Sequence, residues 1–201
     1  MGAYSPAPVL SDAIAERALN EIICPCMAEM AKRGMPYQGV LYAGLMIKDG
    51  QPRLVEYNVR FGDPECQVLM MRLGAQAFDL MQATAKGSLA EMQVNWAEDH
   101  ALTVVMAANG YPGAYEKGSE IKGLKDLPED SANMVFHAGT VAQDGAILAN
   151  GGRVLNVTAR GDTLAEAQER AYAMVDGIDW PEGFCRRDIG WREVEREAKQ
   201  G

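Results

Sequence analysis

The sequence lacks the features that mark several large classes of protein. Lys and Arg never form a run longer than a pair, and the formal net charge is −9, so the basic surface of a nucleic-acid-binding protein is not expected. No stretch of about 18 apolar residues is present, and the chain does not open with a basic segment followed by an apolar one. We therefore expect a globular, cytoplasmic protein that has neither nucleic acid nor membrane as a partner.

Cysteine and histidine are too few and too irregularly spaced to indicate a covalent or metal centre. Cys24, Cys26, Cys66 and Cys185 match neither a disulfide framework nor a paired C-x-x-C zinc motif, so four reduced thiols are expected. Cys66 has no histidine near it in the sequence to act as its base, which argues against nucleophilic catalysis. His137 lies in an apolar run with no second metal ligand at a suitable spacing, which favours a buried core residue.

What the sequence does contain is an ordinary globular composition. Hydrophobic residues make up 48% of the 201 residues and charged residues make up 23%. A chain of this length can hold one large domain or two small ones. The apolar pattern breaks around residues 94–99, and we therefore predict a domain boundary near Asn95, with domains at 1–95 and 96–201.

The first of these predicted domains combines helical and strand-like patterns. Ser11 is a candidate N-cap, Pro25 is expected to kink or restart the helix that follows, and an Asp-Gly pair indicates a hairpin turn. Asp63 and Pro64 have the form of an N-cap and a first helical residue. The expected elements are an irregular start at 2–8, a helix at 11–33, strands at 39–47 and 53–59, and helices at 64–73 and 76–86.

The second predicted domain reads as strands followed by a helix. Strands are expected at 102–107, 134–141 and 153–159, with a glycine-rich loop at 109–123 and a turn at Asp144-Gly145. Thr163 and Glu166 form a possible capping box. The helix after them carries an apolar stripe towards Ile178, made of Ala167, Ala171, Met174 and Val175. The overall pattern predicts an α+β fold.

The strand at 53–60 has an unusual polar face. Period-two alternation predicts a core face that carries Val55, Tyr57 and Val59. It places on the opposite face Leu54, Glu56, Asn58 and Arg60.

The polar face suits a nucleotide and its metal ion. Glu56 and Asn58 offer two hard oxygen ligands for Mg²⁺, Arg60 offers a planar donor fork for phosphate, and Leu54 offers an apolar surface for adenine. From spacing alone, however, the favoured interpretation is an exposed Glu56–Arg60 pair with Asn58 as a turn former. Asp63 and Pro64 likewise need only start a helix.

A family resemblance covers nearly the whole chain and changes this balance. The segment Arg60-Phe-Gly-Asp-Pro-Glu-Cys-Gln67 resembles the signature of phosphoribosylamine–glycine ligases, which belong to the ATP-grasp enzymes. The agreement recurs in the same order along the chain, in Met1-Gly-Ala-Tyr-Ser-Pro-Ala-Pro8, Gly39-Val-Leu-Tyr-Ala-Gly-Leu-Met46, Gly110-Tyr-Pro-Gly113, Val135-Phe-His-Ala-Gly-Thr140, Gly151-Gly-Arg-Val-Leu-Asn-Val-Thr158 and Arg186-Arg-Asp-Ile-Gly-Trp191.

The resemblance implies a reaction and a set of site residues. Members of the family use ATP to join glycine to 5-phosphoribosylamine through a glycyl phosphate, giving glycinamide ribonucleotide for purine biosynthesis. By this resemblance Glu56 and Asn58 bind Mg²⁺ or Mn²⁺, and Arg60 contacts the transferring phosphate. The turn Asp63-Pro64-Glu65 borders the pocket for glycine and phosphoribosylamine. Residues 1–95 then correspond to the C-terminal half of the ATP-grasp domain, and 96–201 to a small α+β C-terminal domain.

The resemblance also implies that a preceding part of such an enzyme is missing. Met1 matches an internal residue of a family motif, so we expect a piece of a longer enzyme that is inactive alone. Two alternatives are a non-catalytic module that assembles with a separate N-terminal chain, and a standalone metal-binding or nucleotide-sensing domain.

Overall fold

The computed structural model describes residues 1–128 and 130–199, and it divides the chain into two compact units. Unit 1 consists of Met1–Pro6, Asp63–Gly74 and Trp96–Gly201, whereas unit 2 consists of Ala7–Gly62 and Ala75–Asn95. Both units combine helices with antiparallel strands, which confirms the α+β class. The division into 1–95 and 96–201 stays a prediction. Within its second part, Glu129, Gln200 and Gly201 lie outside the described residues.

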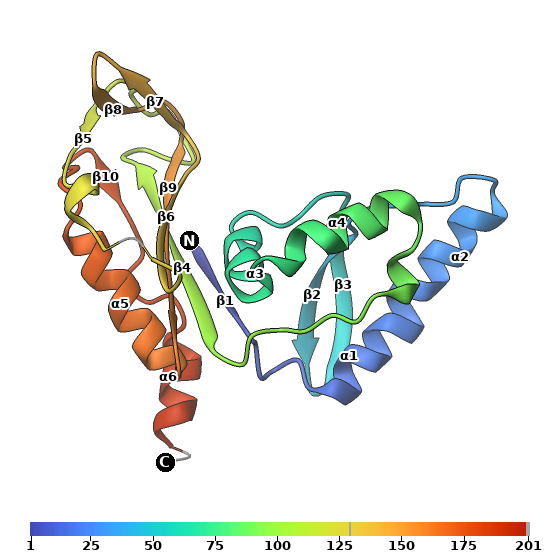
Figure 1. Ribbon diagram of the computed structural model, residues 1–201. Helices are drawn as coiled ribbons and strands as arrows, with labels where there is room; N and C mark the ends of the chain where they lie inside the picture. Colours follow the sequence, from blue (N-terminus) through green and yellow to red (C-terminus); the bar gives the residue numbers. More distant parts are fainter. Residues whose placement is uncertain (129, 200–201) are drawn as a thin grey trace. The chain divides into compact units, whose positions relative to one another are not determined.

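Unit 1 is built on an antiparallel sheet (Figure 1). Its strand order is β1 (Gly2–Ser5), β4 (His100–Ala108), β9 (Arg153–Gly161) and β6 (Asn133–His137), and β10 (Gly183–Phe184) also pairs with β4. The prediction of an irregular start at 2–8 was wrong for Gly2–Ser5. Those residues pair with Ala101–Val104, and a partner so distant in the sequence leaves no local signal.

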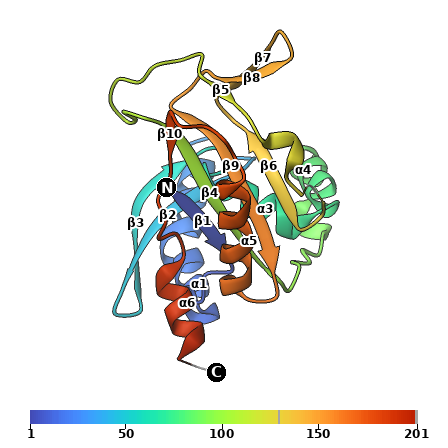
Figure 2. The ribbon, with the colours of Figure 1, turned by 90° about the vertical axis from the view of Figure 1, so that its left-hand side faces the viewer.

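Helices cover both faces of this sheet (Figure 2). On one face lie α5 (Leu164–Asp176) and α6 (Trp191–Ala198), and on the other lies α3 (Glu65–Leu73). The capping-box prediction is confirmed, because the Thr163 hydroxyl accepts a hydrogen bond from the Glu166 amide at 3.1 Å. The predicted stripe on α5 is buried, and it packs in one core with buried residues of β4 and β9, among them Leu102, Val104, Leu155, Val157 and Ala159.

Alternation along β4 and β9 gives the α3 side of the sheet a partly polar layer. Thr103 and Thr158 are both fully buried and face each other across the two strands, with their hydroxyl oxygens 2.7 Å apart. Asn156 lies beside them, also buried. This face therefore depends on a hydrogen bond as well as on apolar contact.

A smaller sheet in unit 1 is built around the predicted Asp144-Gly145 turn, which joins two of its strands. Its order is β5 (Glu120–Ile121), β8 (Ala146–Ala149) and β7 (Thr140–Gln143). The single strand predicted at 134–141 is in fact two strands, because the chain bends at Gly139, where a Cβ would lie 2.7 Å from Cα of Gly151. The prediction that His137 is buried was also wrong, since it is exposed at this bend and its Nδ1 lies 3.0 Å from the Thr140 hydroxyl.

Unit 2 joins helices to a two-stranded hairpin. Its elements are α1 (Asp12–Ala18), a π-helical turn (Leu19–Ile23), α2 (Cys24–Lys32), β2 (Tyr42–Lys48), β3 (Gln51–Asn58), α4 (Gln76–Lys86) and a 3₁₀ turn (Leu89–Glu91). The restart at Pro25 is confirmed, because α2 begins at Cys24 after the π-helical turn and has Pro25 in its first turn. The Asp49-Gly50 hairpin turn is confirmed as well, with positive φ at both residues.

Within the part of the chain that the structure describes, no helix is long and apolar enough to cross a membrane.

Candidate functional site

Glu56 and Asn58 are held next to each other by strand β3. The Asn58 side-chain amide donates a hydrogen bond of 3.1 Å to Oε1 of Glu56. The Asn58 amide oxygen therefore lies on the same side of the strand as a carboxylate. This pair can offer two hard oxygen atoms to one divalent cation, which would keep water or phosphate oxygens in its other positions.

A β-bulge interrupts the alternation on which the predicted faces of β3 depend. Glu56 pairs with Gly44 and Leu54 pairs with Leu45, so Val55 has no partner opposite it, and the prediction that Leu54 shares a face with Glu56 was wrong. The prediction that Val55 and Val59 are core residues was wrong, because they are 66% and 70% exposed. Only Tyr57 of that face is half-buried, and its hydroxyl donates to the carbonyl of Ile22 at 2.9 Å. A hairpin backed by a single helix cannot bury a whole strand face.

Leu54 and Arg60 flank the pair along the chain. Leu54 is 40% exposed, so it can offer an apolar surface to a ligand. Arg60 is exposed, and its Nη1 donates to the carbonyl of Phe61 at 2.7 Å. Among the contacts of the described residues this is the only hydrogen bond of Arg60, so the rest of its guanidinium fork is left for an anion.

The other three predicted residues belong to unit 1. Helix α3 begins at Glu65 with Pro64 as its N-cap, so the prediction of Asp63 as the N-cap was wrong by one residue. Asp63 is bound instead by Arg153, with Nη2 3.0 Å from Oδ2 of the carboxylate and Nη1 3.0 Å from the peptide carbonyl. The seven candidates thus form two sets, with Leu54, Glu56, Asn58 and Arg60 in unit 2 and Asp63, Pro64 and Glu65 in unit 1.

Arg153 is the residue that sequence reasoning missed. It stands in the segment Gly151-Gly152-Arg153, which carried the family resemblance without a role for its arginine. The two adjacent glycines were an available signal, because such a pair often marks a close approach of two backbone segments.

The thiol next to this turn is not a candidate nucleophile. Burial, and secondarily the negative charge of Asp63, raise the pKa of Cys66. The predicted state of the cysteines is confirmed, since all four are free. Within residues 1–128 and 130–199, no cluster of three His, Cys, Asp or Glu side chains could hold a metal ion, so a metal at Glu56 and Asn58 would need further ligands from substrate or water.

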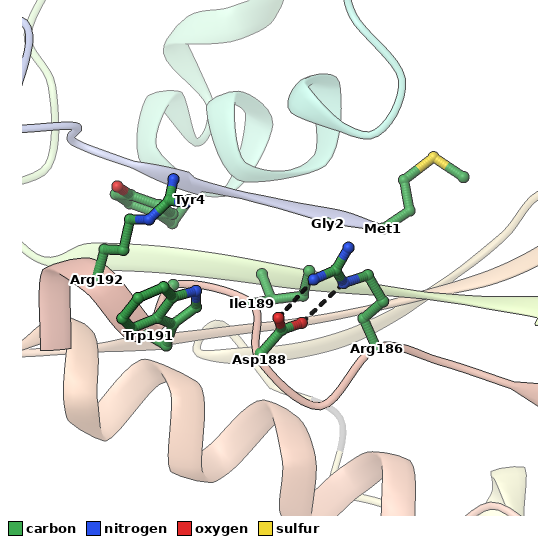
Figure 3. A pocket seen from close by; sticks show the side chains of 9 residues that line it. Met1, Gly2, Tyr4, Arg186, Asp188, Ile189, Trp191 and Arg192 are labelled. Carbon is green, nitrogen blue, oxygen red and sulfur yellow. Dashed lines mark hydrogen bonds and ion pairs between the residues drawn. The ribbon is translucent and has the colours of Figure 1, made fainter.

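Unit 1 also contains a pocket of about 430 Å³ beside β1 and the start of α6 (Figure 3). Arg186 and Asp188 form an ion pair in its wall, and hydrogen bonding from Arg186 lowers the pKa of Asp188. The Arg192 guanidinium carbon lies 5.2 Å from the ring centre of Trp191. The seven predicted site residues are not part of this wall.

Comparison with known proteins decides the family. The model of the phosphoribosylglycinamide synthetase ATP-grasp (A) domain matches residues 1–66, and the model of the C domain of the same synthetase matches residues 101–192. A phosphoribosylamine–glycine ligase of Mesorhizobium japonicum is 58% identical over 98% of this chain, and one of Escherichia coli is 52% identical over the same share. The chain belongs to the phosphoribosylamine–glycine ligase family.

It corresponds to the C-terminal part of such ligases and spans 46% of the length of each of these two relatives. A solved phosphoribosylamine–glycine ligase from Thermotoga maritima superposes with a TM-score of 0.81 at 35% identity, covering 94% of this chain and 46% of that one. The predicted fold is therefore confirmed as part of an ATP-grasp domain followed by the C domain of the family.

Proposed function

We propose that this chain supplies the C-terminal part of an enzyme that ligates glycine to 5-phosphoribosylamine, with ATP as co-substrate and glycinamide ribonucleotide, ADP and phosphate as products. The observation that carries the proposal is the Glu56–Asn58 pair, bonded at 3.1 Å on one strand. It lies inside the segment that matches the ATP-grasp domain of the family. By the same reasoning the enzyme acts in purine biosynthesis in the cytoplasm.

In this proposal residues of β3, together with Arg60 just beyond it, position the phosphates of ATP. Glu56 and Asn58 hold Mg²⁺ or Mn²⁺, and such an ion would supply positive charge against the phosphate oxygens. Arg60 donates hydrogen bonds to the phosphoryl group that passes from ATP to the carboxylate of glycine. Leu54 contacts the adenine. The amine of phosphoribosylamine then attacks the glycyl phosphate, and phosphate leaves.

The turn at Asp63-Pro64-Glu65 would border the pocket for glycine and phosphoribosylamine. Its geometry supports this role, because Arg153 fixes both the carboxylate and the carbonyl of Asp63. We place the end of the ATP-grasp part near residue 95 and the C domain at 96–201.

We further propose that the chain is inactive alone and requires the preceding part of the enzyme, because its relatives are more than twice as long. The surface of unit 2 supports this, since apolar side chains such as Val55, Val59 and Phe78 are 66–70% exposed. The alternative is that the chain is a non-catalytic module whose partner is a separate N-terminal chain.

The test is ADP release that requires both glycine and phosphoribosylamine. We expect none from the chain alone, and restored turnover when the preceding half of the Mesorhizobium japonicum ligase is added. Turnover by the chain alone would contradict the need for a second half. A stable complex without turnover would favour the non-catalytic module. If the two chains form no complex and show no turnover, the result would contradict the proposal.

A variant tests the metal ligands. Glu56→Gln should raise the Mg²⁺ concentration for half-maximal turnover at least about tenfold, because a carboxylate ligand is lost. The matched control is Glu16→Gln, an exposed glutamate of α1, which should leave the Mg²⁺ dependence unchanged. Calorimetric titration of the chain alone with Mg-ATP tests the standalone alternative, which requires tight binding that Glu56→Gln abolishes.

A further inference from the structure

One arginine of unit 1 binds a predicted substrate-pocket residue at two points. Arg153 lies at the start of β9, and its guanidinium meets the Asp63 carboxylate through Nη2 and the Asp63 carbonyl through Nη1, both at 3.0 Å. Its Nη1 also lies 3.6 Å from the sulfur of Met1. The side chain and the backbone of Asp63 are therefore fixed by the same rigid donor fork.

The backbone around Arg153 is shaped to direct it there. Strict alternation would place Arg153 on the same face as Leu155, which is buried in the core. A bulge in β9 itself shifts the register, because Met106 pairs with Leu155 whereas Ala107 pairs with Arg153, which leaves Val154 without a partner opposite it. The bulge therefore frees Arg153 from the core face and allows it to reach Asp63.

Glycines fix the chain immediately before Arg153. A Cβ on Gly151 would lie 2.9 Å from Cα of Gly139, and a Cβ on Gly152 would lie 2.4 Å from the ring of Tyr111. The backbone at Gly139 and the Tyr111 ring therefore leave no room for a side chain at residues 151 and 152, where only glycine fits. Arg153 consequently extends from a corner that has little freedom to move.

The contacts between Arg153 and Asp63 are more extensive than those of an ordinary surface ion pair. The side chains of Arg153 and Asp63 are 31% and 41% exposed, and ion pairs of such exposure add little to folding. Arg187 and Asp176, also in unit 1, form a comparable pair at 57% and 60% exposure, without a bond to a backbone carbonyl among the contacts of the described residues. The contacts of Arg153 also leave Asp63 Oδ1 without a partner among those residues.

We infer that Arg153 is a positioning residue, which holds Asp63 so that its free Oδ1 accepts a hydrogen bond from the primary amine group of a substrate. The inference rests on the proposed function, in which both glycine and phosphoribosylamine carry such a group. A carboxylate with one oxygen fixed by a cation and the other directed at a ligand discriminates amines from neutral or acidic compounds of similar size.

The experiment uses the chain together with the preceding half of the ligase. Arg153→Lys keeps the charge, but one ammonium cannot reproduce the two-point fork. We expect the KM of at least one amine substrate to rise about tenfold, with the KM of ATP within about twofold of wild type. Asp63→Asn should give a similar rise, and the double variant should be no worse than either single one.

The matched control is Arg187→Lys, which alters the other arginine–aspartate pair of unit 1 and should leave all three KM values unchanged. If Arg153 had a purely structural role, Arg153→Lys would lower kcat or the thermal stability of the protein. It would not raise the KM of an amine substrate relative to the KM of ATP. An active wild type with unchanged amine KM in Arg153→Lys would overturn the inference and leave the proposed function intact.

If the assembled wild type makes no product, the proposed function itself is contradicted. A second measurement still tests the role of Arg153 in that case. Hydrogen exchange of the chain alone reports on the turn directly. Arg153→Lys should speed exchange in peptides that cover residues 61–70, whereas Arg187→Lys should not. Equal exchange in both variants would show that Arg153 does not hold the turn.

Discussion

The two units differ in how far each buries its own apolar side chains. Unit 1 has a continuous core between its sheet and α5, in which residues such as Leu155 and Val157 are fully buried. In unit 2 the buried apolar residues are three alanines, Ala18, Ala77 and Ala83. Most of the exposed large apolar side chains of the described residues lie in unit 2, and Val55, Val59 and Phe78 are the most exposed of them.

This difference is what we expect if, as proposed, unit 2 contacts a preceding part of the enzyme and unit 1 does not. Unit 1 contains the segment that matches the C domain, whereas most of unit 2 lies within the match to the ATP-grasp domain. Unit 2 leaves large apolar groups in water, and the proposed partner would cover them. Unit 1 should therefore determine the stability of the chain.

The largest expected effect separates the two units directly. Leu155→Ala should lower the free energy of unfolding by about 3 kcal/mol, because it removes apolar contacts and leaves a cavity in a packed core. Phe78→Ala on α4 should change it by less than about 0.5 kcal/mol, because Phe78 is 69% exposed. Urea unfolding followed by tryptophan fluorescence reports unit 1, since Trp96, Trp180 and Trp191 all belong to it, and far-UV circular dichroism reports both units.

Equal losses in the two variants would break the comparison. They would mean that Phe78 is already covered in solution, for example by a second copy of the chain. Repeating the unfolding at several protein concentrations distinguishes that case, because association makes the midpoint concentration-dependent.

A smaller effect is expected on the polar face of the unit 1 sheet. Thr158→Val should cost about 2 kcal/mol, because it leaves the buried Thr103 hydroxyl without its partner. The double variant Thr103→Val, Thr158→Val removes both hydroxyls and should be closer to wild type than the single one. If the double variant loses the sum of two single losses, the hydroxyl pair is not the cause.

The sequence predicted these elements with unequal success, for physical reasons. Signals that act within a few residues were reliable, as at Thr163, at Pro25 and in the Asp49-Gly50 turn. Features set by distant segments were missed or misplaced, namely the strand at Gly2–Ser5 and the bend at Gly139.

The same distinction holds for the candidate site. Alternation brought Glu56 and Asn58 to one side of β3, which their hydrogen bond confirms. The prediction from alternation failed at Val55, because a bulge depends on how two strands pair and cannot be recognised in the sequence of one strand. Arg153 was missed because its approach to Asp63 links residues 90 positions apart, although the two glycines before it were a local signal. The roles of the site residues in catalysis stay predictions.

Helix caps offer a finer comparison of the two units. Thr163→Ala should destabilise unit 1 by about 1 kcal/mol, because the Thr163 hydroxyl accepts from the Glu166 amide. Ser11→Ala in unit 2 should cost only a few tenths of a kcal/mol, because Ser11 holds the N-cap position without a side-chain bond. Thermal unfolding of the two variants measures both. A larger loss for Ser11→Ala would show that its cap bond forms in solution.

The smallest expected effect is on the stability of unit 1 at acidic pH. Hydrogen bonds from the backbone amide of Ala132, and then from Asn133, lower the pKa of Asp130 in unit 1. A lowered pKa means that the folded state favours the carboxylate, so the contribution to stability is complete above the unfolded value, about pH 4, and is lost as the pH falls through the folded value.

Asp130→Asn keeps an oxygen that can accept from the Ala132 amide but has no charge to titrate. Between pH 6 and pH 3 its melting temperature, followed by tryptophan fluorescence, should therefore fall less steeply than that of wild type. Asp12→Asn removes a carboxylate from unit 2, so the tryptophan transition should keep its wild-type pH dependence. If Asp130→Asn shows the full wild-type slope, the acid sensitivity of unit 1 arises elsewhere, and the Arg186–Asp188 pair, whose aspartate also has a lowered pKa, becomes the next group to replace.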